Sequence, residues 1–140
     1  MAQRPGGPLE RAVASVGDRW TLLVVAALLD GPLRFNQLAE AVPGLAPNIL
    51  SRRLRHLEEH GLVVAAPYSR RPPRLTYELS ASGRELAGAL SLLASWGGRR
   101  SNAEHVRHHG ACGTPVEARW WCPTCDRPVD EAEGEELHFL

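Results

Sequence analysis

The sequence contains no lysine: all 16 of its basic residues are arginine, and they balance 16 acidic residues. Aromatic residues make up only 6% of the 140 residues. No apolar run approaches the roughly 18 residues that a membrane-spanning helix needs. The first residues, which include Pro5 and Pro8, lack the apolar stretch of a signal peptide. We therefore expect a cytoplasmic protein without a membrane segment.

Cysteine is also scarce, and its three residues cannot form a closed disulfide framework because their number is odd. In a reducing compartment we expect free thiols or metal ligands instead. The sequence lacks the G-x-S-x-G motif of many hydrolases, the phosphate-binding loop and the H-E-x-x-H metalloprotease motif. These absences argue against an enzyme.

Charge divides the chain into two parts. Residues 1–100 carry 13 Arg against 8 acidic residues, a net charge of +5, whereas residues 101–140 carry 3 Arg against 8 acidic residues, a net charge of −5. With 44% hydrophobic residues, the chain has enough apolar material for a core. We predict a basic domain over residues 1–100 and a small acidic tail over residues 101–140.

Hydrophobic periodicity predicts that the first part is mainly α-helical with a small β-hairpin, an α+β fold. Helices are expected over residues 9–16, 19–29, 35–42 and 47–60, with Asp18 as an N-cap and Gly61 as a stop. The second helix is apolar nearly all round, so it should be central and buried. Residues 43–46 form a four-residue turn, which gives the spacing of a helix-turn-helix motif.

The fourth predicted helix has two different faces. Leucines at positions 50, 54 and 57 should point inward, whereas the other face carries Asn48, Ser51, Arg52 and Arg55. A recognition helix presents such groups to the DNA major groove, where Arg binds guanine and Asn binds adenine. A solvated surface helix carries similar residues, so this helix alone does not decide between the two interpretations.

A basic hairpin follows the fourth helix. Residues 62–67 and 74–79 are predicted strands, and the loop between them contains Arg70 and Arg71. Such a hairpin is a wing that contacts the minor groove or the phosphates. An ordinary basic loop is the alternative, but a helix-turn-helix followed by a hairpin favours DNA binding, and the predicted architecture is a winged helix-turn-helix.

The last helix of the first part is predicted over residues 82–96. Leu86, Leu90, Leu93 and Trp96 form an apolar stripe at helical spacing, and Gly97 and Gly98 should end the helix. The stripe either packs on its own core or packs on a partner subunit. Its place on a terminal helix of a small domain favours dimerisation.

Six features resemble the HxlR family of winged-helix transcription regulators: GDRWTLL at 17–23, DGPLRFNQL at 30–38, PNILSRRL at 47–54, LEEHGLV at 57–63, PPRLTYEL at 72–79, and Gly83. Together they cover about residues 8–97. The resemblance implies a homodimer, with the first and last helices at its interface, that binds a pseudo-palindromic double-stranded DNA operator. We expect such a regulator to act as a repressor. The resemblance also implies DNA contacts from Ser51, Arg52 and Arg55 and, in the wing, from Arg70 and Arg71.

The sequence departs from that family at a position that matters for regulation. Several HxlR-like regulators sense oxidants through a cysteine near the N-terminus, where this chain has Gly7. The usual redox switch is therefore missing. The effector, whether a small molecule or a redox signal, is not identified by the sequence.

The tail carries a candidate zinc site. His109 and Cys112 form one close pair, Cys122 and Cys125 form a second, and nine residues separate the pairs. Four such ligands suit one tetrahedral Zn²⁺ in a closed, structural site, and the second pair resembles a zinc-ribbon knuckle. A ribbon that has lost its metal and a C-x-x-C redox pair are the alternatives, and His108 or His105 could replace His109. An oxidation-sensitive zinc site is a further hypothesis.

Other tail residues carry weaker expectations. Residues 116–121 are predicted to form a strand, in which one of Trp120 and Trp121 packs inward and the other meets the body or a partner. The acidic residues 130–136 should be solvated. The first functional interpretation is a dimeric DNA-binding transcription regulator; the alternative is a protein–protein interaction module built from a winged helix and a zinc ribbon.

Overall fold

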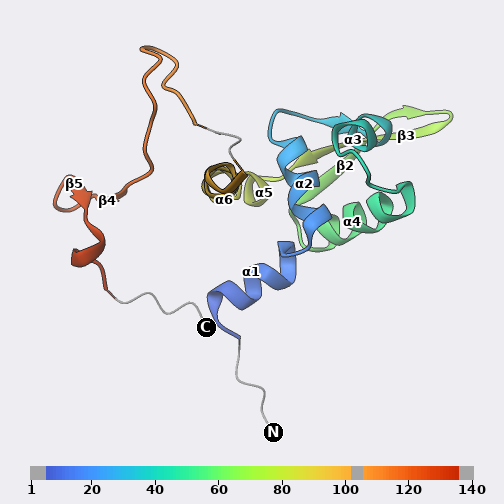
Figure 1. Cartoon of the computed structure of the whole chain (residues 1–140). Helices are drawn as coiled ribbons and strands as arrows, with labels where there is room; N and C mark the ends of the chain where they lie inside the picture. The colour runs from blue at the N-terminus through green and yellow to red at the C-terminus, as the bar shows by residue number, and fades with distance from the viewer. Residues whose placement is uncertain (1–5, 102–105, 136–140) are drawn as a thin grey trace, which may run out of the picture. The chain divides into compact units, whose positions relative to one another are not determined.

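The computed structural model describes residues 6–101 and 106–135. The first part has six α-helices and three strands: α1 (Pro8–Val16), α2 (Arg19–Leu28), β1 (Leu33–Arg34), α3 (Phe35–Ala41), α4 (Pro47–Glu59), β2 (Val63–Arg70), β3 (Pro73–Leu79), α5 (Ala81–Arg84) and α6 (Ala87–Ser101) (Figure 1). The tail has β4 (Trp120–Cys122), β5 (Arg127–Val129) and a 3₁₀ helix, η1 (Glu131–Glu133).

Residue contacts divide the chain into two compact units, and the division falls after Leu90, inside α6. Helices combined with small antiparallel sheets confirm the predicted α+β class. In the part of the chain that the structure describes, no helix has both the length and the apolar character needed to cross a bilayer.

The helix ends follow local capping chemistry. The Asp18 carboxylate accepts hydrogen bonds from the backbone N–H groups of Trp20 (3.0 Å) and Thr21 (3.1 Å), which satisfies two free donors at the start of α2. Pro47 occupies the first turn of α4, where its missing N–H costs no helical bond. Gly61 follows α4 with a φ of +68°, a conformation that favours glycine. The predicted helix boundaries are confirmed at these points.

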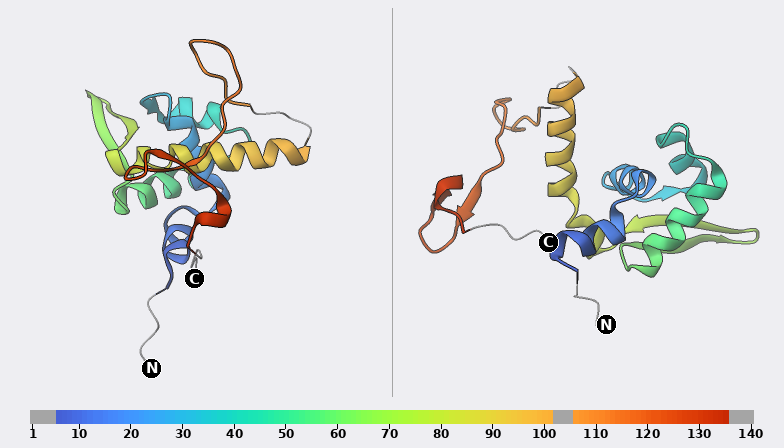
Figure 2. Two further views of the ribbon diagram at one scale, coloured as in Figure 1. Left: turned by 90° about the vertical axis from the view of Figure 1, so that its left-hand side faces the viewer. Right: turned by 60° about the horizontal axis from the view of Figure 1, so that its bottom comes forward.

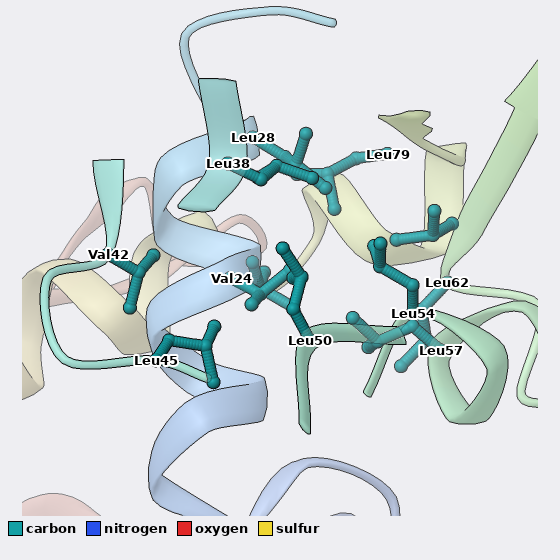
Figure 3. Packing of buried hydrophobic residues seen from close by; sticks show 12 residues of the cluster. Val24, Leu28, Leu38, Val42, Leu45, Leu50, Leu54, Leu57, Leu62 and Leu79 are labelled. Atoms are coloured by element: carbon teal, nitrogen blue, oxygen red, sulfur yellow. The ribbon is translucent and has the colours of Figure 1, made fainter. Parts of the chain in front are cut away.

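One hydrophobic core joins the helices to the sheet. The inward side chains of α2 and α4 face each other, with Val24 beside Leu50 in Figure 3. Leu50, Leu54 and Leu57 are at most 2% exposed, as their spacing predicts. The remaining buried members of the core are Val25, Leu28, Leu38, Val42, Leu45, Leu62, Val63 and Leu79.

The prediction that α2 is central and buried holds for only one side of the helix. Thr21, Val24, Val25 and Leu28 are buried, but Leu23 is 42% exposed and Leu29 is 37% exposed. A domain this small has only one core, so the body covers one side of α2 and leaves apolar side chains on the other.

The sheet has the strand order β1-β3-β2, with antiparallel pairing throughout. The two-residue strand β1, which pairs Leu33 with Tyr77, is too short to leave a periodic pattern in the sequence and was not predicted. The β2–β3 hairpin is longer than predicted: residues 68–70 belong to β2, and Pro73 begins β3. It projects from the helices of the first unit in both views of Figure 2.

The single helix predicted over residues 82–96 is wrong, because the structure has two helices separated at Glu85 and Leu86. Gly97 and Gly98 do not end the second of them. Neither glycine has a positive φ, and the Ser101 hydroxyl donates a hydrogen bond to the Gly97 carbonyl (3.0 Å). Glycine within a helix costs only about 1 kcal/mol relative to alanine, so α6 can continue to Ser101.

The tail differs from its prediction in two respects. Within the predicted strand over residues 116–121, only Trp120 and Trp121 belong to a strand, β4, and Val116 lies outside it. Both tryptophans point to solvent, since Trp120 is 73% exposed and Trp121 is 57% exposed. No residue between 106 and 135 is buried, so this segment has no interior to receive either indole ring.

The acidic end of the tail is solvent-exposed as far as residue 135, and Glu136 lies outside the described residues. One of its carboxylates is nevertheless paired: Glu133 accepts hydrogen bonds from both terminal nitrogens of the Arg127 guanidinium group, at 2.8 and 2.9 Å. This pairing lowers the pKa of Glu133.

Candidate nucleic-acid interface

The turn between α3 and α4 sets the angle between these helices. Gly44 has a φ of +83°, and Leu45 is 6% exposed, so its side chain anchors the turn in the core. The predicted four-residue turn and the helix that follows it are therefore both present. Together α3 and α4 form the helix-turn-helix motif.

Two polar contacts fix how α4 is rotated. The Nε2 atom of His56 lies 2.8 Å from the Ser15 carbonyl oxygen at the end of α1. The Nε atom of Arg53 lies 3.7 Å from the Asp18 carboxylate at the start of α2. The buried leucines of α4 and these two contacts orient Arg53 toward α2. Arg52 and Arg55 consequently point away from the core.

The outward face of α4 carries the residues that the sequence singled out. Asn48, Ser51, Arg52 and Arg55 are all exposed. Among the residues that the structure describes, neither Arg52 nor Arg55 has an ion-pair partner. This face therefore offers hydrogen-bond donors that no acidic side chain within residues 6–101 and 106–135 engages.

The hairpin adds a second basic element. Arg70 ends β2 and Arg71 lies at the tip, and both side chains are exposed. Arg74, which the sequence pattern did not single out as a DNA contact, lies on β3 opposite Ser69, near the tip of the hairpin. Its position directly after the Pro72–Pro73 pair was the signal that could have identified it.

A cleft lies between the start of α3 and the hairpin. It has a volume of about 550 Å³ and is lined by Arg34, Phe35, Asn36, Tyr68, Pro73, Arg74, Leu75 and Tyr77. The Arg34 guanidinium group stacks over the Tyr68 ring, with 4.3 Å between the group and the ring centroid. Burial, and to a smaller extent the Glu58 carboxylate, raises the pKa of Tyr77. No feature of the sequence predicted Arg34 as a neighbour of the wing.

The candidate metal ligands form two close pairs. The Nδ1 atom of His109 lies 3.2 Å from the Cys112 sulfur, and the Cys125 backbone N–H donates to the Cys122 sulfur at 3.4 Å. The structure does not bring the two pairs together: within residues 6–101 and 106–135, no three His, Cys, Asp or Glu side chains are grouped as a metal site requires. His105 lies outside the described residues.

Hydrogen bonds shift the thiols of this region toward the thiolate. Contacts with the side chain and backbone of Thr114, and then with His109, lower the pKa of Cys112 to about 7. Hydrogen bonding from Cys125, and then from the Thr124 backbone, lowers the pKa of Cys122. The thiolate is the form of cysteine that binds metal ions and reacts as a nucleophile.

Comparison with known proteins supports the interpretation of the first part. The profile of the HxlR-like helix-turn-helix family matches residues 15–105. Rv3095 of Mycobacterium tuberculosis, described as an uncharacterized HTH-type transcriptional regulator, is 37% identical over 129 residues, which span 89% of this chain and 80% of the relative.

Solved structures agree with the sequence comparison. A candidate transcription factor of Pseudomonas aeruginosa, PA1374, matches with a TM-score of 0.69 and 29% identity, over 94% of this chain and 91% of its own. The redox regulator HypR in its reduced form matches with a TM-score of 0.64 and 28% identity, over 68% of this chain and 94% of its own. The match with PA1374 therefore extends into the tail, whereas the match with HypR spans a smaller share of this chain.

Proposed function

This chain belongs to the HxlR-like helix-turn-helix family of transcription regulators, and on that basis we propose that it acts as a homodimeric repressor of a pseudo-palindromic operator. Its relatives are regulators with a DNA-binding fold and not enzymes. The observation that carries the proposal is the face of α4, where exposed Arg52 and Arg55 have no ion-pair partner in the described part of the chain.

In the proposal, α4 and the β2–β3 hairpin contact different parts of the DNA. Arg52 and Arg55 form bidentate hydrogen bonds with guanine in the major groove, while Asn48 binds adenine or a phosphate and Ser51 binds a phosphate. Arg70 and Arg71 of the hairpin bind phosphates or enter the minor groove. The net charge of +5 over residues 1–100 attracts the DNA backbone.

The homodimer is supported by apolar side chains that the single chain leaves uncovered. On α1, Leu9 is 46% exposed and Val13 is 56% exposed. On α6, Leu92 and Leu93 are 52% exposed and Trp96 is 56% exposed. These are the first and last helices of the first part of the chain, and a second copy of the chain would remove their apolar surface from water.

Repression follows from the size of the proposed complex. A dimer with two recognition helices engages half-sites about one helical turn, or roughly 10 base pairs, apart. A protein bound in this way covers promoter DNA that a polymerase would otherwise occupy. The proposal needs no enzymatic step and no ligand, although an effector that alters the dimer would change the spacing of the two helices.

Selection of bound fragments from a random duplex-DNA library, at physiological salt, tests the proposal. We expect enrichment of an inverted repeat, because the two-fold symmetry of the dimer imposes the same symmetry on its operator. Enrichment of a single, unrepeated half-site would contradict the dimer. Weak binding without sequence preference would contradict the proposal as a whole and favour a protein–protein interaction module.

A further inference from the structure

We propose that the tail binds one Zn²⁺ through His109, Cys112, Cys122 and Cys125, which occupy equivalent positions in two turns of the same backbone design. This inference does not depend on DNA binding. It rests on the geometry of the two turns, on the chemistry of their side chains and on the absence of a core between residues 106 and 135.

The first turn spans residues 109–113. The Gly113 N–H donates a hydrogen bond to the His109 carbonyl (2.8 Å), and Gly113 has a φ of +70°. A hairpin encloses the turn: the His109 N–H donates to the Thr114 carbonyl (2.8 Å), and the Val116 N–H donates to the Arg107 carbonyl (2.8 Å).

The second turn spans residues 122–126 and repeats this pattern. The Asp126 N–H donates to the Cys122 carbonyl (2.9 Å), and Asp126 has a φ of +53°. A hairpin encloses this turn too, because Cys122 pairs with Arg127 where β4 meets β5. Asp126 is the only residue other than glycine with a positive φ in the described ranges.

The two turns therefore match position by position. In each, two candidate ligands lie three residues apart, and the residue after the second ligand is left-handed and closes the turn with its N–H. A turn of this kind holds two side chains on the same side, within reach of one ion. Two such turns supply one imidazole and three thiolates, a Cys₃His set that binds Zn²⁺ tetrahedrally.

The tail also needs a source of stability other than apolar burial. No residue from 106 to 135 is buried, and four of its large apolar side chains, Val106, Val116, Trp120 and Trp121, are 42% to 73% exposed. A segment of this size without a core requires a metal, a disulfide or a partner to remain folded. The close ligand pairs favour the metal.

Zinc binding would shorten the distance between the two hairpin turns. In the described residues the two ligand pairs do not meet, so the ion would draw the turns together. The free energy of metal binding then contributes directly to folding of the tail. With four protein ligands the ion has no open position, and its role is structural.

The geometry selects His109 over its neighbour as the fourth ligand. His109 lies inside the turn, with its Nδ1 atom 3.2 Å from the Cys112 sulfur. His108 lies in the hairpin stem, where it forms a β-bridge with Pro115. Because successive residues of an extended strand point to opposite sides, His108 provides a matched control one residue away.

The test measures metal in the full-length protein. We expect one zinc ion per chain by elemental analysis, and we expect Co²⁺ added to the metal-free protein to produce the thiolate charge-transfer and intense d–d bands of a tetrahedral site. Cys122→Ser, Cys125→Ser and His109→Ala should lose the ion or its tetrahedral spectrum. His108→Ala should retain both, and far-UV circular dichroism should show that the helices remain folded in every variant.

Three results would overturn the proposal. Purified protein without metal, and with no tetrahedral spectrum on addition of Co²⁺, would exclude the site. A disulfide between Cys122 and Cys125 that forms reversibly at cellular redox potential would identify a redox pair instead. Loss of the ion in His108→Ala but not in His109→Ala would remove His109 from the ligand set.

Discussion

Helix α5 can pack close to the sheet because residue 83 is a glycine. A Cβ atom at this position would collide with the Leu62 carbonyl oxygen and would lie 3.1 Å from a Leu79 methyl carbon. We expect Gly83→Ala to lower the free energy of unfolding by roughly 1–3 kcal/mol, because backbone must move to admit the methyl group. Urea unfolding followed by circular dichroism measures the change.

Gly88 provides the matched control for that substitution. A Cβ atom there meets no atom within 4 Å, and the residue lies in α6. Gly88→Ala should raise the free energy of unfolding by roughly 0.5–1 kcal/mol through helix propensity alone. Equal effects of the two substitutions would mean that Gly83 is not required for close packing.

The wing arginines act on DNA through charge in our account. We expect Arg70→Ala and Arg71→Ala to weaken binding to selected and unselected duplexes alike, because phosphates carry no sequence information. The slope of log affinity against log salt concentration should fall by about one for each phosphate contact that is removed. An unchanged slope in both variants would place the wing away from the DNA.

Among single residues, the outward side chains of α4 were predictable from the sequence, because helical spacing alone separates them from the buried leucines of the same helix. The sequence did not predict that Arg53 would turn toward the body. That orientation depends on the Asp18 carboxylate, which lies 3.7 Å away but 35 positions earlier in the chain. Arg34 was missed for the same reason, since its stacking on Tyr68 requires the tertiary fold.

Helix α2 is the element whose first turn depends most clearly on one capping residue, Asp18. Asp18 accepts two backbone hydrogen bonds at the start of this helix, and its carboxylate also faces Arg53. We expect Asp18→Ala to lower the free energy of unfolding by about 1 kcal/mol, within a range of roughly 0.5–2 kcal/mol. Thermal or urea unfolding of the full chain gives this value.

Asp18→Asn separates the cap from the ion pair. Asparagine retains the accepting oxygen but loses the charge, so this variant should keep most of the stability. A loss as large as that of Asp18→Ala would show that the ion pair with Arg53, and not the cap, stabilises the start of α2.

Helices with clear caps were predictable, and elements that depend on long-range pairing were not. Asp18, Pro47 and Gly61 mark their helix ends locally. By contrast, β1 has two residues and exists only because it pairs with β3. The hairpin extends past Pro67 through backbone pairing, which composition does not reveal, and no periodic signal marks the interruption between α5 and α6 at Glu85–Leu86.

In the whole molecule, the exposed apolar side chains of α6 should mediate contact between two copies of the chain. We expect Trp96→Glu to shift the protein from dimer to monomer, because the interface would have to bury the new carboxylate. Ala94→Glu adds the same charge on α6, about 200° around the helix from Trp96, and should leave the dimer intact. Sedimentation velocity or light scattering distinguishes these states.

A wild-type monomer at micromolar concentration would contradict the proposed dimer. Equal dissociation in both variants would indicate that added charge, and not the loss of Trp96, disrupts the assembly. The sequence predicted the apolar stripe on this helix, but it placed Leu86 and Leu90 in the same set as Leu93 and Trp96. The structure divides them, because Leu86 and Leu90 pack against the core and the other two are exposed.

The central claim is that the outward face of α4 reads DNA sequence. The most direct test is the affinity of Arg52→Ala and Arg55→Ala for the selected operator, with Arg107→Ala as a control that removes the same charge from the exposed tail. We expect each α4 variant to lose about 1–3 kcal/mol, or roughly 5- to 150-fold, and to relax the preference at one base position, while Arg107→Ala binds nearly as the wild type does. Wild-type affinity and sequence preference in both α4 variants would contradict the claim.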